Sequence, residues 1–267
     1  MFASLNPYII TGIGLLYIFT MTTLGAALIF FFKKNVSVLF NKIFLGFAAG
    51  VMLAAAVWGL IIPSLETTES GLLPPWFIVS LGIILGTLFL LLIDNLIPHL
   101  HLDSKNPEGL KSSWKRTTLL YLAVALHNIP EGLAVGLAFG LAIHLGTSEA
   151  MGAAIGLAIG IGIQNFPEGA AVTLPLKNEG FSNSKAFTYG MLSGIVEPIF
   201  GIFGLFIAIY LSSVMPWMLS FAAGAMLYVI VEELIPEAHL GEHSHLGTFG
   251  LISGFILMMI ISVALTV

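Results

Sequence analysis

The stretch from residue 117 to residue 143 reads TTLLYLAVALHNIPEGLAVGLAFGLAI. Its apolar character continues for longer than the roughly 20 residues that a helix needs to cross a lipid bilayer. Its only His, Asp, Glu, Lys or Arg side chains are His127 and Glu131, near the middle. A charge there costs about 2.5–3.5 kcal/mol on insertion scales. The stretch therefore predicts a membrane-spanning helix with candidate functional groups at its centre.

The whole chain has the same apolar character. Of its 267 residues, 58% are hydrophobic and 9% are charged, whereas soluble domains are about 25% charged. These charges are too few to cover a water-exposed surface, which indicates an integral membrane protein and excludes a soluble enzyme and a disordered chain. The net charge of −5 argues against a nucleic-acid partner. The absence of cysteine excludes disulfides and thiolate metal ligands.

Apolar segments separated by turn residues predict eight membrane-spanning helices in a single transmembrane domain, residues 1–267, embedded in the lipid bilayer. The expected spans are 8–32, 43–63, 76–98, 117–143, 149–176, 186–211, 216–239 and 247–266. The predicted fold class is therefore an all-α integral membrane protein. The first segment is too long for the apolar core of a signal peptide and no basic residues precede it, so we expect a retained helix.

All basic residues fall near three alternate connections, those between spans one and two, three and four, and five and six. They are Lys33, Lys34, Lys42, Lys105, Lys111, Lys115, Arg116, Lys177 and Lys185. The positive-inside rule assigns these connections to the cytoplasm, so we expect both termini on the extracytoplasmic side. The expected location is a cell membrane, the inner membrane in a bacterium.

Three spans carry a glutamate next to a proline near their middle. The motifs are HNIPEG at 127–132, QNFPEG at 164–169 and VEP at 196–198. Residues three and four apart share one face of a helix, so His127 and Asn128 project from the same face as Glu131. The second motif repeats this spacing, and its helix is an antiparallel neighbour of the first. We therefore predict that the two motifs meet at one depth.

Proline has no N–H and displaces the carbonyl four residues earlier, which predicts a pseudo-symmetric pair of broken helices in spans four and five. Inverted-repeat transporters use such helices at midplane binding sites. Glycines at four-residue spacing beside both motifs indicate close helix packing. They are Gly132, Gly136, Gly140, Gly152, Gly156 and Gly160.

No Lys or Arg lies within any predicted span to neutralise these glutamates. A divalent cation would do so, and imidazole with carboxylate suits zinc, iron, manganese or cadmium better than calcium or magnesium. One alternative is a set of protonated glutamates hydrogen-bonded between helices. Another is an intramembrane metal-dependent hydrolase, although the chain lacks HExxH and leaves no central carboxylate as general base.

With these motifs the sequence resembles the ZIP (Zrt-, Irt-like protein) family of divalent metal transporters, in its bacterial GufA-like branch. The similarity covers essentially the whole chain and rests on HNIPEG in span four and QNFPEG in span five. It implies a transporter, not an enzyme, that takes up Zn²⁺, and also Cd²⁺, Fe²⁺ or Mn²⁺, into the cytoplasm. It further implies a homodimer and an elevator-like movement of spans 1, 4, 5 and 6 against spans 2, 3, 7 and 8.

The resemblance also implies a binuclear metal centre. Its first position would use His127, Glu131, Gln164, Glu168 and, from the second span, Met52. Its second position would use Asn128, Asn165 and Glu197, with Glu131 and Glu168 bridging the two. Many members have His in place of Gln164 and some have Asp in place of Asn165, so this centre carries less charge than theirs.

Two further groups of residues are candidates for the ends of a metal path. Glu66 resembles the family's entrance carboxylate, with a solvated loop acid as the alternative. Two similar motifs would line an exit, DNLIPHLH at 94–101 and EELIPEAH at 232–239. The alternative is that they are only polar residues at the interface between membrane and water. The expected exit residues are Asp94, His99, His101, Glu232, Glu233, Glu237 and His239, and His243 and His245 continue the second cluster.

Overall fold

The computed structural model describes residues 5–31, 38–68, 73–100, 109–111, 116–178, 180–239 and 245–266. Within these ranges, eight helical stretches are long and apolar enough to cross a membrane. They are Pro7–Phe30, Lys42–Thr67, Pro75–Leu96, Leu122–Leu145, Ser148–Leu174, Asn183–Tyr210, Ser212–His239 and Leu246–Ala264. Each overlaps one predicted span, which confirms the all-α membrane fold class.

These spans are built from eleven α-helices in the described part of the chain, with short 3₁₀ and π segments between some of them. The α-helices are α1 (Pro7–Ala27), α2 (Val38–Ala55), α3 (Ile62–Thr67), α4 (Pro75–Leu96), α5 (Arg116–Leu145), α6 (Ser148–Asn178), α7 (Asn183–Ser193), α8 (Val196–Tyr210), α9 (Met215–Val229), α10 (Ile235–His239) and α11 (Leu246–Ala264). The 3₁₀ segments are η1 (Leu28–Phe30) and η3 (Ser212–Val214), and the π segments are η2 (Ala56–Ile61) and η4 (Ile230–Leu234).

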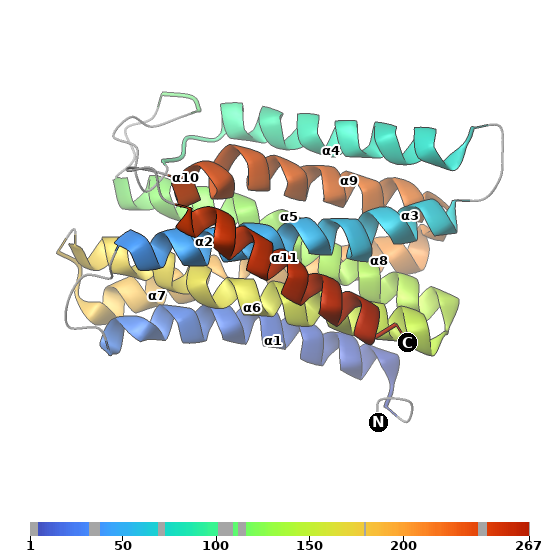
Figure 1. The fold of residues 1–267 in the computed structure, drawn as a ribbon, viewed down its shortest axis with the longest axis horizontal. Coiled ribbons are helices and arrows are strands. Elements are labelled where there is room, and N and C mark those ends of the chain that lie inside the picture. Colours follow the sequence, from blue (N-terminus) through green and yellow to red (C-terminus); the bar gives the residue numbers. More distant parts are fainter. Residues whose placement is uncertain are drawn as a thin grey trace.

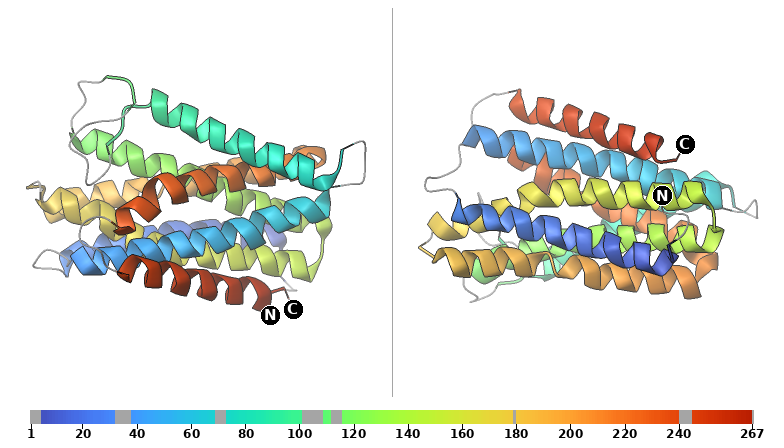
Figure 2. Two further views of the ribbon diagram at one scale, coloured as in Figure 1. Left: turned by 45° about the horizontal axis from the view of Figure 1, so that its top comes forward. Right: turned by 90° about the horizontal axis from the view of Figure 1, so that it is seen from below.

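The spans run side by side in one bundle, with both termini at the same end (Figure 1), as an even number of spans requires. The most extensive helix pairs are α2–α11, α4–α9, α1–α6 and α5–α8. We define the first helix group as α1, α5, α6, α7 and α8, and the second helix group as α2, η2, α3, α4, α9, η4, α10 and α11. The two groups meet mainly through α2 with α6 and α5 with α9, and the views in Figure 2 show the bundle from two further sides.

The prolines of the two motifs lie inside continuous helices. α5 remains helical through Pro130 and α6 remains helical through Pro167. Neighbouring helices can satisfy the carbonyls that such prolines leave without a donor, which is why membrane helices tolerate them. The interruption in this region is instead in the sixth span, at Gly194 and Ile195 between α7 and α8.

Two π-helical turns occur in the second helix group. η2 follows α2 and ends two residues before Pro63, and η4 follows α9 and ends two residues before Pro236. Single π turns are frequent near functional sites. Because the helix continues beyond η2, the second span extends to Thr67, past the end predicted at residue 63.

Glycine lets α5 and α8 touch through their backbones. A methyl group on Gly132 would overlap the carbonyl oxygen of Glu197, and one on Gly136 would overlap the carbonyl oxygen of Gly201. The predicted close packing beside the first motif is therefore confirmed, and it brings Glu197 against α5.

We expect Gly136→Ala to destabilise the protein by about 1–3 kcal/mol, because neither backbone can move away without disturbing the helix pair. The matched control is Gly12→Ala in α1, where a methyl group would meet nothing within 4 Å. Alanine is the better helix former by about 1 kcal/mol, so this control should be neutral or stabilising. Thermal unfolding of the purified proteins in detergent measures both. Equal midpoints would contradict the close packing.

Candidate metal centre

The predicted motif residues meet where α5, α6 and the start of α8 come together. α5 and α6 are joined by a turn at Gly146 and Thr147. Glu131 and Gln164 lie at nearly equal distances from that turn along their antiparallel helices. Gln164 Nε2 donates a hydrogen bond of 2.6 Å to Glu131 Oε1, so the two motifs are at one depth, as predicted.

The amide groups of the two asparagines also have hydrogen-bond acceptors. Asn165 Nδ2 donates to Glu197 Oε2, and Asn128 Nδ2 donates to the carbonyl of Ser193 at 2.9 Å. Glu131, Gln164, Asn165 and Glu197 are fully buried and Asn128 is 1% exposed. The structure thus joins five of the residues that the sequence assigned to the centre.

A further donor comes from α1, which sequence reasoning did not assign to the centre. Thr22 Oγ1 donates to Glu197 Oε1 at 3.0 Å. A single threonine in an apolar helix carries no sequence signal for such a role, since Ser and Thr also bond back to their own helix.

Four buried oxygens of the centre have no hydrogen-bond partner among the described residues. They are Asn128 Oδ1, Glu131 Oε2, Gln164 Oε1 and Asn165 Oδ1. A buried acceptor without a donor costs about 1–3 kcal/mol. The amide N–H groups of these residues, in contrast, have acceptors. An excess of acceptor oxygens over donors is the environment that binds a cation.

Carboxylates and imidazoles alone do not make up this centre. Among the residues that the structure describes, no three His, Asp or Glu side chains stand close enough to hold a metal ion. The amide oxygens of Gln164, Asn128 and Asn165, which have no hydrogen-bond partner, are further groups here that could hold a cation.

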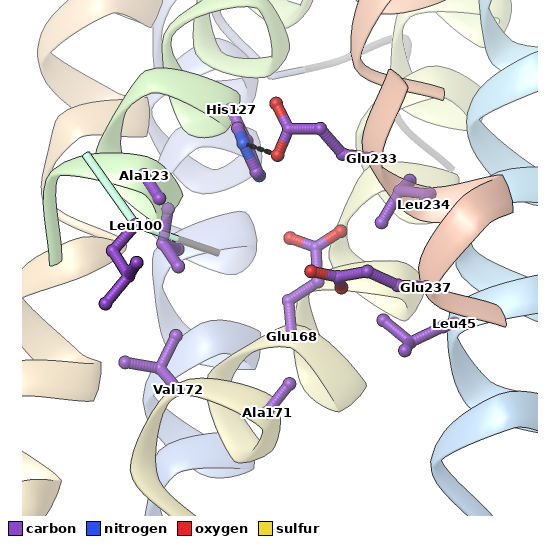
Figure 3. A pocket seen from close by; sticks show the side chains of 11 residues that line it. Leu45, Leu100, Ala123, His127, Glu168, Ala171, Val172, Glu233, Leu234 and Glu237 are labelled. Atoms are coloured by element: carbon purple, nitrogen blue, oxygen red, sulfur yellow. Dashed lines mark ion pairs between the residues drawn. The ribbon is translucent and has the colours of Figure 1, made fainter. Parts of the chain in front are cut away.

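A small cavity of about 50 Å³ adjoins the centre on the side of the basic residues. Figure 3 shows the carboxylates of Glu168 and Glu237 pointing into it from two different helices, α6 and α10. His127 and Glu233 form an ion pair at its edge. His127 lies on α5 and Glu233 on η4, so this pair crosses between the two helix groups. The sequence named both residues but did not predict their contact.

The other predicted site residues lie at the two ends of the bundle or in its core. Met52 is fully buried in the apolar core. Glu66 lines two cavities at the end of the bundle that holds the termini, of about 360 and 630 Å³. Glu149, which sequence reasoning did not single out, lines the first of these with it.

The predicted exit residues lie in different surroundings. Glu233 and Glu237 line the small cavity, whereas the neighbouring Glu232 is exposed. The ring of His239 contacts the hydroxyl of Thr248, with 3.2 Å between Nε2 and Oγ1. The predictions for His101 and His243 fall outside the described residues, and His245 precedes α11.

Asp94 contacts two neighbours at the end of the bundle opposite the termini. Its Oδ1 lies 3.0 Å from His99 Nε2, and its Oδ2 accepts a hydrogen bond of 2.9 Å from the Tyr228 hydroxyl. Burial lowers the pKa of His99, but the hydrogen bond and charge of Asp94 and the Ile97 carbonyl outweigh it and raise this pKa to about 8. His99 therefore stays protonated at neutral pH and pairs with Asp94.

We expect His99→Gln to lower the thermal unfolding midpoint at pH 6 and to have less effect at pH 9. The folded-state pKa of about 8 lies above the ordinary value of 6.5, so the stabilisation is complete below 6.5 and is lost as the pH rises through 8. Unfolding midpoints of both proteins across this pH range measure the effect. A difference that does not vary with pH would contradict the ion pair.

An eight-span bundle with polar groups buried at its centre is typical of membrane transporters. Residues 101–262 match the model of the ZIP zinc transporter family. The chain is 38% identical to human zinc transporter ZIP11 over 95% of this chain and 96% of that one. It is 41% identical to the zinc transporter GufA of Myxococcus xanthus over 70% and 71% of the two chains.

The chain also resembles a streptococcal relative, the zinc transporter ZupT of Streptococcus mutans, with 32% identity over 96% of this chain and 98% of that one. The chain therefore belongs to the ZIP family. This is a family of transporters, which confirms a multi-pass membrane protein that is not an enzyme. The intramembrane hydrolase finds no support among these relatives.

Proposed function

We propose that this protein carries divalent transition-metal ions, zinc first, across the membrane into the cytoplasm. The observation that carries the proposal is the set of unpartnered buried oxygens on Asn128, Glu131, Gln164 and Asn165. A bound cation would satisfy them and offset the charge of the glutamates beside them. Relatives named as zinc transporters support zinc as the substrate.

The proposed ligands of the transported ion are those of the first position, Met52, His127, Glu131, Gln164 and Glu168. They would have to draw together when the ion binds, because in the structure His127 pairs with Glu233 and no three of the described His, Asp or Glu side chains stand close enough to hold one ion. Imidazole with carboxylates suits zinc, and a thioether from Met52 would favour softer ions such as cadmium. Iron and manganese are further candidate substrates. A second position would use Asn128, Asn165 and Glu197, with Glu131 and Glu168 bridging in a binuclear centre.

The surroundings of the centre support alternating access. Between the centre and the outer cavities, α5 presents only buried apolar residues at 133–135 and 137, and α6 presents buried Leu157, Ala158 and Ile161. Towards the basic end, the small cavity adjoins His127 and Glu168. A metal ion could leave on that side, by way of Glu233 and Glu237, while the outer side stays closed.

An elevator-type movement fits the division into two helix groups. Most of the proposed ligands lie on the first helix group, and the pair between His127 and Glu233 links it to the second. A negative potential inside the cell would favour entry by about 2.3 kcal/mol per charge per 100 mV. A homodimer remains the expected assembly, and a bacterial inner membrane the expected location.

We expect Glu131→Ala, and separately His127→Ala, to abolish zinc uptake by proteoliposomes, because each removes a ligand of the transported ion. Protein insertion and the thermal unfolding midpoint serve as controls for folding. Saturable uptake in the unchanged protein and none in the variants is the expected result. Full uptake in the folded Glu131→Ala protein would refute the assignment of the site.

The exit path can be tested with two adjacent glutamates. Glu233→Gln should slow zinc uptake at least several-fold, because Glu233 lines the inner cavity and pairs with His127. Glu232→Gln is the matched control, since its side chain is exposed. Initial rates of uptake measure both variants. Equal rates would exclude Glu233 from the path.

The expected orientation, with both termini on the extracytoplasmic side, can be tested with single introduced cysteines, because the chain has no cysteine of its own. Ser213 is exposed at the end of the bundle that holds the termini, and Ser184 is exposed at the opposite end. In intact cells a membrane-impermeant maleimide should label Ser213→Cys and leave Ser184→Cys unlabelled. The reverse pattern would show that the termini are cytoplasmic.

A further inference from the structure

Two cavities lie between the helix groups at the end of the bundle that holds the termini, and Glu66 of α3 lines both. The Glu149 cavity, of about 360 Å³, is lined by Glu149 of α6 together with Ser262 of α11. The His144 cavity, of about 630 Å³, is lined by His144 of α5 together with Ser213 of η3. A path from this end to the metal centre would begin in one of them.

The Glu149 cavity reaches closer to the metal centre. On α5 its deepest lining residue is Ala138, seven residues from Glu131, whereas that of the His144 cavity is Leu141, ten residues from Glu131. A helix rises about 1.5 Å per residue, so these two positions lie about 10 and about 15 Å from Glu131 along the helix axis. On the second span the Glu149 cavity extends to Trp58, while the His144 cavity extends only to Glu66.

Both helix groups contribute a carboxylate to the Glu149 cavity. Glu66 comes from the second helix group and Glu149 from the first, and both side chains are exposed. The connections at this end, residues 68–74, 146–147 and 211–214, contain no Lys or Arg. A cavity lined by one sign of charge concentrates ions of the opposite sign and raises the rate at which they enter. The Glu149 cavity therefore attracts cations.

A buried hydroxyl group without a partner also belongs to this cavity. Ser262 lines the cavity and is 8% exposed, and its hydroxyl has no hydrogen-bond partner among the described residues. Serines in helices commonly bond back to their own helix, as Ser253 of α11 does to the carbonyl of Gly250 at 2.7 Å. The hydroxyl of Ser262 is instead available to a group inside the cavity, such as a metal ion or one of its water ligands.

The place of Glu149 in the first turn of α6 has a second explanation, because an acid there stabilises the start of a helix. This end of α6 already has a cap, since Ala150 N donates to Thr147 Oγ1 at 3.2 Å. Helix stability accounts for an acid in this turn but not for its place beside the cavity. The adjacent residue Ser148 lines a different cavity, together with Pro7.

We propose that zinc enters the protein through the Glu149 cavity, where Glu149 and Glu66 capture the hydrated divalent cation and the Ser262 hydroxyl contacts it next. The His144 cavity is then not part of the path. Sequence reasoning did not single out Glu149 or Ser262. This inference rests on the proposed function, because it assumes zinc uptake from the end of the bundle that holds the termini.

The path can be tested by blocking each cavity in turn. Ser262→Cys and Ser213→Cys are matched variants, because each replaces a serine that lines one cavity in a chain without cysteine. Cells that express the full-length protein are treated with a membrane-impermeant, positively charged methanethiosulfonate, and mass spectrometry measures the extent of reaction. We expect the reaction to slow initial zinc uptake severalfold in Ser262→Cys and to leave it unchanged in Ser213→Cys.

Three results of this experiment would overturn the choice of cavity. They are slower uptake after reaction of Ser213→Cys, unchanged uptake after complete reaction of Ser262→Cys, and a Ser262→Cys thiol that stays unreacted while Ser213→Cys reacts, since an entrance must be accessible. A failure of both thiols to react would instead refute the proposed orientation.

The capture role is tested separately, with a substitution at the exposed Glu149 that spares the protein core. Glu149→Gln should raise the KM for zinc about threefold at low ionic strength and leave the maximal rate unchanged, because it weakens only the attraction of the ion. The difference should shrink in about 1 M salt, where the screening length falls to about 3 Å. His144→Gln is the control for the other cavity and should not change the KM.

A double variant separates capture from helix stability. Glu149→Gln/Ser148→Glu keeps an acid in the first turn of α6 but moves it to a residue that lines a different cavity, so its KM should stay raised. A KM restored to that of the unchanged protein, or no rise in Glu149→Gln, would overturn the role of Glu149 and leave the proposed function standing. An unchanged protein without saturable zinc uptake would refute the proposed function itself.

Discussion

The surplus of buried acceptor oxygens over donors at the middle of the bundle is the constraint on which the rest of the structure depends. Glutamates are costly at this depth, and the spans predicted from the sequence contain no Lys or Arg that could neutralise them. The neighbouring amides and Thr22 provide only part of the compensation. The helices must therefore approach closely enough to share these few donors, and glycine at the contacts of α5 with α8 makes this approach possible.

The helices of the bundle pack most extensively within the two helix groups and less extensively between them. The largest helix contacts are within the first or the second helix group. Contacts between the groups include His127 with Glu233, a pair of polar side chains beside a cavity. Such a pair can separate when its partners find other ligands or water, whereas backbones in contact through glycine cannot separate without leaving a void. The candidate metal centre thus lies next to a polar contact between the two helix groups.

The fold could be predicted from the sequence because each span is a long apolar segment bounded by turn residues. The spacing of His127, Asn128 and Glu131 was enough to predict one shared face, and the short turn after α5 brings the second motif to the same depth. These features depend on local sequence and helix geometry. The end of the second span was predicted too early because a proline reads as a helix stop, whereas the π turn before Pro63 lets the helix continue.

The contacts made by single residues could not be predicted in this way. Thr22 looks like any threonine in an apolar helix, and only the packing of α1 on α6 and α8 brings it to Glu197. The similar motifs around Asp94, His99 and Glu233 also led to the prediction that all three residues line the same exit. In the structure, Asp94 pairs with His99 and Tyr228, whereas Glu233 reaches His127, since the depth and rotation of a helix depend on all its neighbours.

Three connections of the chain pass from one helix group to the other, at residues 31–37, 97–115 and 211–214. The last is the shortest, with Leu211 followed by the 3₁₀ segment η3. A 3₁₀ segment rises about 2 Å per residue, and an extended chain spans at most about 3.3–3.6 Å per residue. Stretching these few residues therefore lengthens the link by only about 6 Å. Unless α8 or α9 unwinds at its end, this link limits how far the two helix groups can slide apart at the end of the bundle that holds the termini.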